Sequence, residues 1–165
     1  MGFRKGYTLL EVLVVVAMVA AILLVSLPRL LWILQTFYVK SAASQMAMHI
    51  RFARNESVTR KIDYRIVIKN RTAPLKPNTY LIECDPQEDM TFETVPNFTT
   101  NLPKGVEILN SAVFSSGVAI ISFNSRGAAT SLVGSPPYFI QIRSVNGETY
   151  QVQVQLTGSV QINKV

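Results

Sequence analysis

The sequence predicts an α+β fold in which one long amino-terminal helix precedes a β domain. From Val12 to Val25, fourteen consecutive residues have no polar side chain, and a helical spacing of apolar residues continues well beyond this run. After Lys61 the apolar residues follow the two-residue alternation of strands instead. A chain of 165 residues has room for one domain of ordinary size and an appendage.

The apolar segment is long enough to cross a membrane as a helix. A hydrocarbon core of ~30 Å needs about 20 helical residues, which the stretch from Leu9 to Leu34 supplies if Pro28 and Arg29 lie near its outer edge. Trp32 then falls at the interface, where aromatic rings are favoured. A cleaved secretory signal fits less well, because the run is long, no small-x-small cleavage pattern follows it, and the next residues stay apolar.

The helix is predicted to run from about Thr8 to Arg60. Pro28 lacks an N–H and clashes with the preceding turn, so we expect a kink or loosened turn between about Leu24 and Pro28. The second half of the helix has an apolar stripe that indicates packing on a sheet. The stripe consists of Val39, Ala43, Met46, Ile50 and Ala53.

The region after Lys61 is predicted to be all strand and loop. Asn146-Gly147 is a strong hairpin signal, because both residue types tolerate the positive φ that tight turns require. Seven prolines after residue 70 mark loops or edge strands. Six strands are predicted by alternation and β-branched or aromatic content: 63–69, 79–84, 91–95, 118–123, 138–143 and 150–156.

Composition excludes several classes of function. Apolar residues make up 48% and charged residues 16%, which argues against intrinsic disorder. Cys84 is the one cysteine and His49 the one histidine, so disulfide scaffolds, zinc fingers and redox Cys-x-x-Cys sites are excluded. His49 lies off the apolar stripe and is predicted to be a surface residue of the helix. We therefore expect no cofactor and no enzymatic activity.

The first residues form a specific pattern. A six-residue leader containing Arg4 and Lys5 ends in Gly6, and an aromatic residue, Thr, two Leu and Glu11 follow it directly before the apolar run. This arrangement resembles the leader and helix start of type IV pilins and type II secretion pseudopilins. Tyr7 stands where that family usually has Phe, which keeps the aromatic ring. A proline at the position of Pro28 also resembles pilins.

The resemblance implies a processing pathway and partners. A prepilin peptidase would cut after Gly6 and methylate the new terminus at Tyr7, and Glu11 would become the fifth mature residue. The implied organisation is a leader at 1–6, a transmembrane helix half at 7–34, an amphipathic helix half at 35–61 and a periplasmic β domain at 62–165. Implied partners are the peptidase, major and other minor pilins or pseudopilins, and the inner membrane.

The order of elements resembles one branch of this family, which contains the minor pseudopilin H (GspH) of type II secretion and the minor pilins FimT and FimU. The segments that carry the resemblance are 51–60 at the helix end, 122–127 and 156–160. In that branch the globular part is a two-sheet antiparallel structure packed on the helix. The implied function is a structural subunit that helps initiate or cap a pseudopilus or pilus. The sequence leaves open which of the two machines it serves.

Glu11 conflicts with a plain membrane anchor. An acidic side chain toward the bilayer centre costs roughly 2.5–3.5 kcal/mol on insertion scales. Another chain can offset this cost by presenting a positive charge at the same depth, such as a newly cut amino terminus at Tyr7. Alternatively, Glu11 lies close enough to the interface to reach water.

Nucleic-acid binding is the alternative function. The formal net charge is +6, and basic residues concentrate between Arg51 and Lys76, where Arg65, Lys69 and Arg71 are the candidate DNA contacts. Basic residues at a helix end also complement its dipole, which is a simpler explanation for part of the cluster. DNA-binding FimT proteins have an Arg-rich motif near the carboxyl end, whereas residues 158–165 here contain no arginine. This departure argues against DNA binding.

An acidic loop follows Cys84. Asp85, Glu88 and Asp89 could supply oxygen ligands to calcium, but their spacing is not that of an EF-hand. A solvated loop is the default expectation, and no metal site is predicted.

Overall fold

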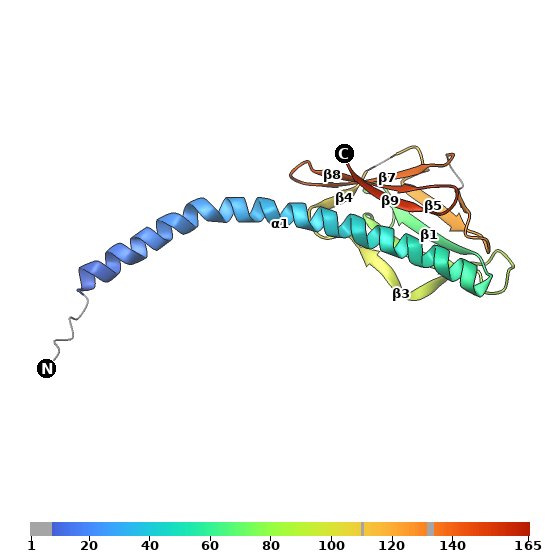
Figure 1. The fold of residues 1–165 in the computed structure, drawn as a ribbon, viewed down its shortest axis with the longest axis horizontal. Coiled ribbons are helices and arrows are strands. Elements are labelled where there is room, and N and C mark those ends of the chain that lie inside the picture. The colour runs from blue at the N-terminus through green and yellow to red at the C-terminus, as the bar shows by residue number, and fades with distance from the viewer. Residues whose placement is uncertain (1–7, 110, 132–133) are drawn as a thin grey trace. The chain divides into compact units, whose positions relative to one another are not determined.

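The computed structural model describes residues 8–109, 111–131 and 134–165. The chain divides into two compact units, Met1–Leu34 and Gln35–Val165, which are described separately here. Helix α1 (Leu9–Arg60) extends through both units, and the strands belong to the second (Figure 1). The strands are β1 (Tyr64–Lys69), β2 (Thr79–Cys84), β3 (Glu93–Asn101), β4 (Val106–Ile108), β5 (Val118–Phe123), β6 (Ala129–Ser131), β7 (Tyr138–Ser144), β8 (Thr149–Val154) and β9 (Val160–Lys164).

The second half of α1 supplies one side of the core. All five residues of the predicted stripe, from Val39 to Ala53, are fully buried, and Ala42, Ala47 and Ser57 extend the stripe. Alanines and a serine on this face let the backbone approach the strands closely, while Met46 and Ile50 fill the space between them. The predicted amphipathic helix packed on sheets is therefore confirmed.

The described strands form two antiparallel sheets that share this core. The first sheet has the order β3-β2-β1-β5-β6, and the second has the order β4-β7-β8-β9. Alternate residues of β1 and β5 from the first sheet, and of β7 and β8 from the second, point inward and contact the helix stripe in one apolar cluster. The predicted α+β class, with a long helix on a two-sheet antiparallel domain, is confirmed.

The hairpin predicted at Asn146-Gly147 joins β7 and β8. Gly147 has φ +88°, and its N–H donates to the Ser144 carbonyl at 3.0 Å. The N–H of Ser144 donates to the Glu148 carbonyl at 2.9 Å and closes the loop. The turn therefore sets the register of the two central strands of the second sheet.

Sequence reasoning was wrong about several strand limits. The third predicted strand, 91–95, is in fact β3 from Glu93 to Asn101, and it continues through Pro96. Pro96 is tolerated because β3 is an edge strand, where a missing N–H breaks no ladder bond. Three short strands, β4, β6 and β9, were not predicted, because three to five residues are too few to show an alternation.

Candidate assembly site

Thr8 and Glu11 begin helix α1. The N–H of Glu11 donates to the side-chain oxygen of Thr8 at 3.2 Å, which is the geometry of an N-cap. The Glu11 carboxylate lies in the first turn, where negative charge is favoured by the helix dipole. Sequence reasoning missed this role for Thr8, although Thr-x-x-Glu before an apolar run is the signal of a capping box.

The helix that carries Glu11 exposes an apolar surface. An 18-residue window of α1 has a mean hydropathy of 2.9, and none of that window is buried in the protein. Large side chains such as Leu10 and Leu24 are more than 70% exposed. A core helix of a water-soluble domain would bury this surface, so this half of α1 requires lipid or other protein subunits around it.

The predicted assembly motif also includes Gly6, Tyr7 and Pro28. Gly6 and Tyr7, the predicted cleavage and methylation positions, lie outside the described residues. The backbone of α1 continues as a helix through Pro28, so the chain is not broken there. The side-chain oxygen of Ser26 donates to the Ile22 carbonyl at 2.9 Å, a contact that tends to bend helices. The kink at Pro28 stays a prediction.

Arg65, one of the candidate DNA contacts, is held within the protein. Its guanidinium pairs with the Glu83 carboxylate on the neighbouring strand β2 and lies 3.8 Å from the centre of the Phe92 ring. Both members of the pair are largely buried, at 28% and 16% side-chain exposure. A guanidinium that is paired and stacked in this way has little capacity left for a phosphate.

The other two candidate DNA contacts lie at the far end of β1. Lys69 is the last residue of this strand, and Arg71 follows in the loop, where it pairs with Glu107 at 3.1 Å. Arg51 and Arg54 on α1 instead donate to the carbonyls of Val160 and Gly127, at 2.9 and 3.2 Å. The basic residues that are close in the sequence are therefore spread over separate parts of the domain, and the structure does not favour a nucleic-acid surface.

The prediction that His49 is a surface residue was wrong. Its ring is half-buried, 5.6 Å from the ring of Tyr80 and 5.5 Å from that of Phe98. Phe98 also stacks on Phe52 at 4.5 Å, so this aromatic group joins α1 to β2 and β3. Burial lowers the pKa of His49 and raises the pKa of Tyr80 to about 12.

The acidic loop after β2 is organised by Asp85. This buried carboxylate accepts hydrogen bonds from the backbone N–H groups of Asp89, at 3.3 Å, and Met90, at 2.8 Å. Within residues 8–109, 111–131 and 134–165, no three His, Cys, Asp or Glu side chains are grouped so as to hold a metal ion. The described arrangement of Asp85 is that of a turn-forming side chain.

The fold and the helix together define a class of protein. A long amino-terminal helix with an exposed apolar first half, and a second half packed on two antiparallel sheets, is the pilin-like fold. The structure is similar to the minor pseudopilin EpsH of the type II secretion system of Vibrio cholerae, with 14% identity and a TM-score of 0.55 over 77% of this chain and 97% of that chain. It is also similar to the type IV minor pilin FimU of Pseudomonas aeruginosa strain PAO1, with 16% identity and a TM-score of 0.52 over 76% and 87% of the two chains.

The sequence itself identifies the family. Residues 42–159 match the family of the type II transport protein GspH, and the chain belongs to this family. Comparison with curated proteins gives no match. Family and fold together make the chain a minor pseudopilin or minor pilin, and such subunits assemble with other pilins or pseudopilins. The resemblance to the GspH and FimU branch is confirmed, and the DNA-binding alternative is not favoured.

Proposed function

We propose that this chain is made as a single-pass inner-membrane precursor and acts as a structural subunit, not as an enzyme. A prepilin peptidase removes residues 1–6 and methylates Tyr7, and the mature subunit enters a pseudopilus or pilus at or near its tip. The observation that supports this proposal is the apolar first half of α1, which is exposed in the protein and includes one carboxylate, Glu11. Such a helix needs surroundings that combine lipid-like packing with a positive partner.

The spacing between Tyr7 and Glu11 gives the proposed assembly its geometry. In the assembled subunit we propose that the helix extends to Tyr7, so that the four residues from Tyr7 to Glu11 correspond to an axial distance of ~6 Å. Glu11 of one subunit therefore meets the amino terminus of a neighbour that is displaced along the axis by a similar length. Repeated displacement in one direction builds a helical filament from heterologous contacts, instead of a closed ring. Two such filaments, the pseudopilus and the pilus, remain candidates.

Substitution of Glu11 tests whether the chain assembles or only anchors. Glu11→Leu removes the charge and lowers the cost of residence in the membrane by up to ~3 kcal/mol, so a simple anchor would be retained at least as well. An assembling subunit would instead be cleaved and inserted normally but recruited poorly, because the neighbour's terminal amine loses its partner. The measurement is crosslinking of the variant to major and minor subunits in cells.

Three controls make the crosslinking experiment decisive. Intact mass of the same samples should show that wild type and variant both begin at Tyr7. Glu11→Gln separates the lost charge from altered packing, and we expect it to be recruited as poorly as Glu11→Leu. Thr8→Val removes the cap of α1 and leaves the carboxylate in place, and we expect it to be recruited. Full recruitment of both Glu11 variants would contradict the proposed pairing, and a mature chain that begins elsewhere would contradict prepilin processing.

A further inference from the structure

The charges of the second unit are divided between its two ends. The strand register and the loop contacts place one set of loops near Gln35, where the chain comes in from the apolar segment, and another near Arg60, where α1 stops. We call these the Gln35 end and the Arg60 end. The Arg60 end carries both signs: five acidic residues, Asp63, Asp85, Glu88, Asp89 and Glu93, lie there beside three basic ones, Arg60, Lys61 and Arg126. Six basic residues lie at the Gln35 end: Lys69, Arg71, Lys76, Lys104, Arg143 and Lys164.

Hydrogen bonds hold the loops of the Gln35 end together. Asn78, at the base of the β1–β2 loop, accepts the N–H of Leu102 at 3.0 Å with its carbonyl and the N–H of Ile108 at 3.1 Å with its side chain. The N–H of Val145, in the β7–β8 hairpin, donates to the Gly105 carbonyl at 2.9 Å. The loops 70–78, 102–105 and 144–148 therefore form one surface.

The first turn of this unit's helix belongs to the same surface. The side chain of Asn146 donates to the hydroxyl of Thr36 at 3.2 Å. The hydroxyl of Ser144 lies 3.5 Å from the Gln35 carbonyl. The hairpin tip is thus fixed beside the residues that follow Leu34 directly in the chain, and the Gln35 end is the part of this unit that the apolar segment leads into.

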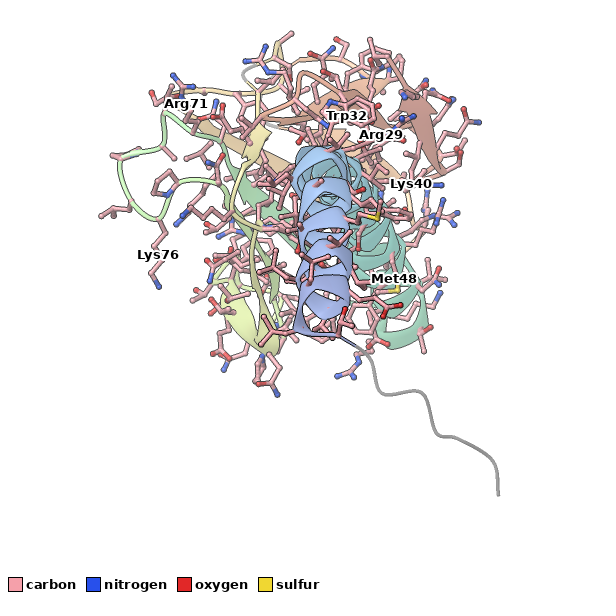
Figure 2. All side chains as sticks on the ribbon, turned by 90° about the vertical axis from the view of Figure 1, so that its left-hand side faces the viewer. Arg29, Trp32, Lys40, Met48, Arg71 and Lys76 are labelled. Atoms are coloured by element: carbon pink, nitrogen blue, oxygen red, sulfur yellow. The ribbon has the colours of Figure 1, made fainter. Side chains whose placement is uncertain are left out.

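Most of the positive charge at this end is not neutralised within the protein. Glu107 pairs with Arg71, and Glu148 pairs with Lys164, both at 3.1 Å. In the described parts of the chain, Lys69, Lys76, Lys104 and Arg143 form no ion pair. Figure 2 shows Arg71 and Lys76 on the β1–β2 loop that projects from the domain, with the Lys76 side chain pointing outward. The end therefore presents a net positive surface.

Exposed apolar side chains accompany these charges on three separate projections. Leu75 on the β1–β2 loop is 73% exposed and precedes Lys76, and Val145 on the β7–β8 hairpin is 77% exposed. Val165, which follows Lys164 at the carboxyl end, is 67% exposed, and its N–H donates to the Thr149 carbonyl at 3.0 Å. Apolar tips beside lysines are the pattern of surfaces that sit on a lipid headgroup layer.

We propose that the Gln35 end of the β domain is a docking surface for anionic lipid headgroups. The proposal rests on the proposed function, in which the apolar segment before Gln35 spans the membrane. Lys76, Lys104 and Arg143 attract the phosphate layer, while Leu75 and Val145 enter the headgroup region. The Arg60 end, where acidic and basic residues are mixed, is attracted less by the same lipids. The β domain of the unassembled subunit is thereby held at the lipid surface through its Gln35 end.

Lipid suits this surface better than nucleic acid does. Proteins that bind nucleic acid contact the phosphates through charge and, in addition, read base edges in the grooves or stack aromatic side chains on bases, whereas the projecting tips here are aliphatic. Exposed leucine and valine gain free energy when they leave water for the acyl boundary and gain little against a phosphate backbone. The occupant is therefore a negatively charged lipid surface.

The experiment measures how deeply a spin label at Val145 enters the lipid. The full chain, with Cys84→Ser and Val145→Cys, is labelled with a nitroxide and placed in lipid nanodiscs, where both membrane faces are open. In discs of phosphatidylglycerol and phosphatidylcholine, we expect the label to lose most of its accessibility to an aqueous nickel chelate. In phosphatidylcholine alone it should stay accessible, and high salt should reverse the protection.

Matched variants test whether the residues of the Gln35 end are those that protect the Val145 label. Leu156→Cys places the same label on another exposed apolar residue, in the loop before β9 and therefore away from the Gln35 end, where β9 finishes at Lys164. This label should remain accessible in both kinds of disc. Lys76→Gln with Lys104→Gln should restore access to the Val145 label. Lys61→Gln with Arg126→Gln removes equal charge near the Arg60 end and should leave protection intact.

Three results would overturn the proposal. The first is equal accessibility of the Val145 and Leu156 labels in every disc, and the second is protection of Val145 that does not depend on phosphatidylglycerol. The third is protection by a short DNA duplex in phosphatidylcholine discs without any from phosphatidylglycerol, which would assign the surface to nucleic acid. Leader cleavage and Glu11 recruitment are not measured here, so failure of this test leaves the proposed assembly to its own crosslinking experiment.

Discussion

Single residues at the end of α1 decide how the helix meets the loops. Arg54 lies across the loop 124–127 and the turn before β9, and its guanidinium donates to the Gly127 carbonyl. Gly158 in that turn has φ +75°, and a Cβ there would stand 2.3 Å from the Gly127 oxygen and 2.5 Å from the Arg54 side chain. Only glycine satisfies both the backbone conformation and the close approach. The turn before β9, in the second sheet, therefore packs closely against the end of the helix.

Gly158→Ala should destabilise the domain strongly, whereas Gly147→Ala should have a mild effect. Gly147 also has a positive φ, of +88°, but a Cβ there meets nothing within 4 Å, so alanine costs only the strain of about 1 kcal/mol. At position 158 the clash with backbone is added, and we expect a total of about 3 kcal/mol or more. Thermal unfolding of both variants, followed by circular dichroism, makes the comparison. Equal melting temperatures would show that the end of α1 can move away from the new methyl group at position 158 without loss of stability.

Among the elements, β3 combines an irregular ladder with an aromatic contact to the helix. It is an edge strand, its register with β2 shifts between Leu81 and Glu83, and Pro96 lies in the stretch 95–98, which has no partner on β2. Phe98 compensates by stacking on Phe52 and meeting the edge of His49. The edge strand is thus held by an aromatic contact with the helix in addition to its ladder with β2. Its irregularity also discourages other chains from pairing with it.

Phe98→Ala should loosen β3 while the rest of the domain stays folded. Phe98 is half-buried, so we expect a loss of about 2 kcal/mol, below the 3–5 kcal/mol typical of fully buried phenylalanine. Hydrogen exchange should accelerate in β3 and the adjacent edge of β2, and remain unchanged in β7 and β8. Phe139→Ala, on β7 and 37% exposed, is the matched control and should leave β3 protected. Uniform acceleration in all strands would indicate that β3 opens only with global unfolding.

At the scale of the whole molecule, the two units differ in what they need. The core residues of the described chain begin at Val39, so the second unit contains its complete apolar cluster. The helix before Gln35 buries none of its apolar window and gains its stability elsewhere. The molecule therefore consists of a domain with its own core and an apolar segment whose surface is not buried within the described chain.

A chain that begins at Gln35 should fold as a cooperative domain, and one that begins at Ala47 should not. The shorter chain lacks Val39, Ala42, Ala43 and Met46, each of which is buried against the sheets, and their loss costs several kcal/mol of the marginal stability of a domain. Near-ultraviolet circular dichroism and chemical unfolding distinguish the two truncated chains. A folded chain from Ala47 would mean that the two sheets form the core without the helix.

The class of fold, the length of α1 and the pattern at its start can all be predicted from the sequence alone. Fourteen uninterrupted apolar residues, a stripe at helical spacing and the alternation after Lys61 are local signals, because each reflects the repeat of one element. The same holds for the Asn146-Gly147 hairpin, where two adjacent residues set the turn. Processing at Gly6 and the role of Glu11 also came from contiguous residues, and they stay predictions.

Contacts between side chains far apart in the sequence depend on how the sheets are assembled. Arg65, Lys69 and Arg71 are close in the sequence, yet Arg65 pairs with Glu83 on the neighbouring strand and stacks on Phe92, just before β3, while Lys69 and Arg71 lie at the Gln35 end. That end joins loops from residues 70 to 165, and no local spacing records their proximity. Strand order and register bring these loops together, because in antiparallel pairing every second connection lies at the same end of the sheet. A surface made of several loops is therefore visible only when the sheets are assembled.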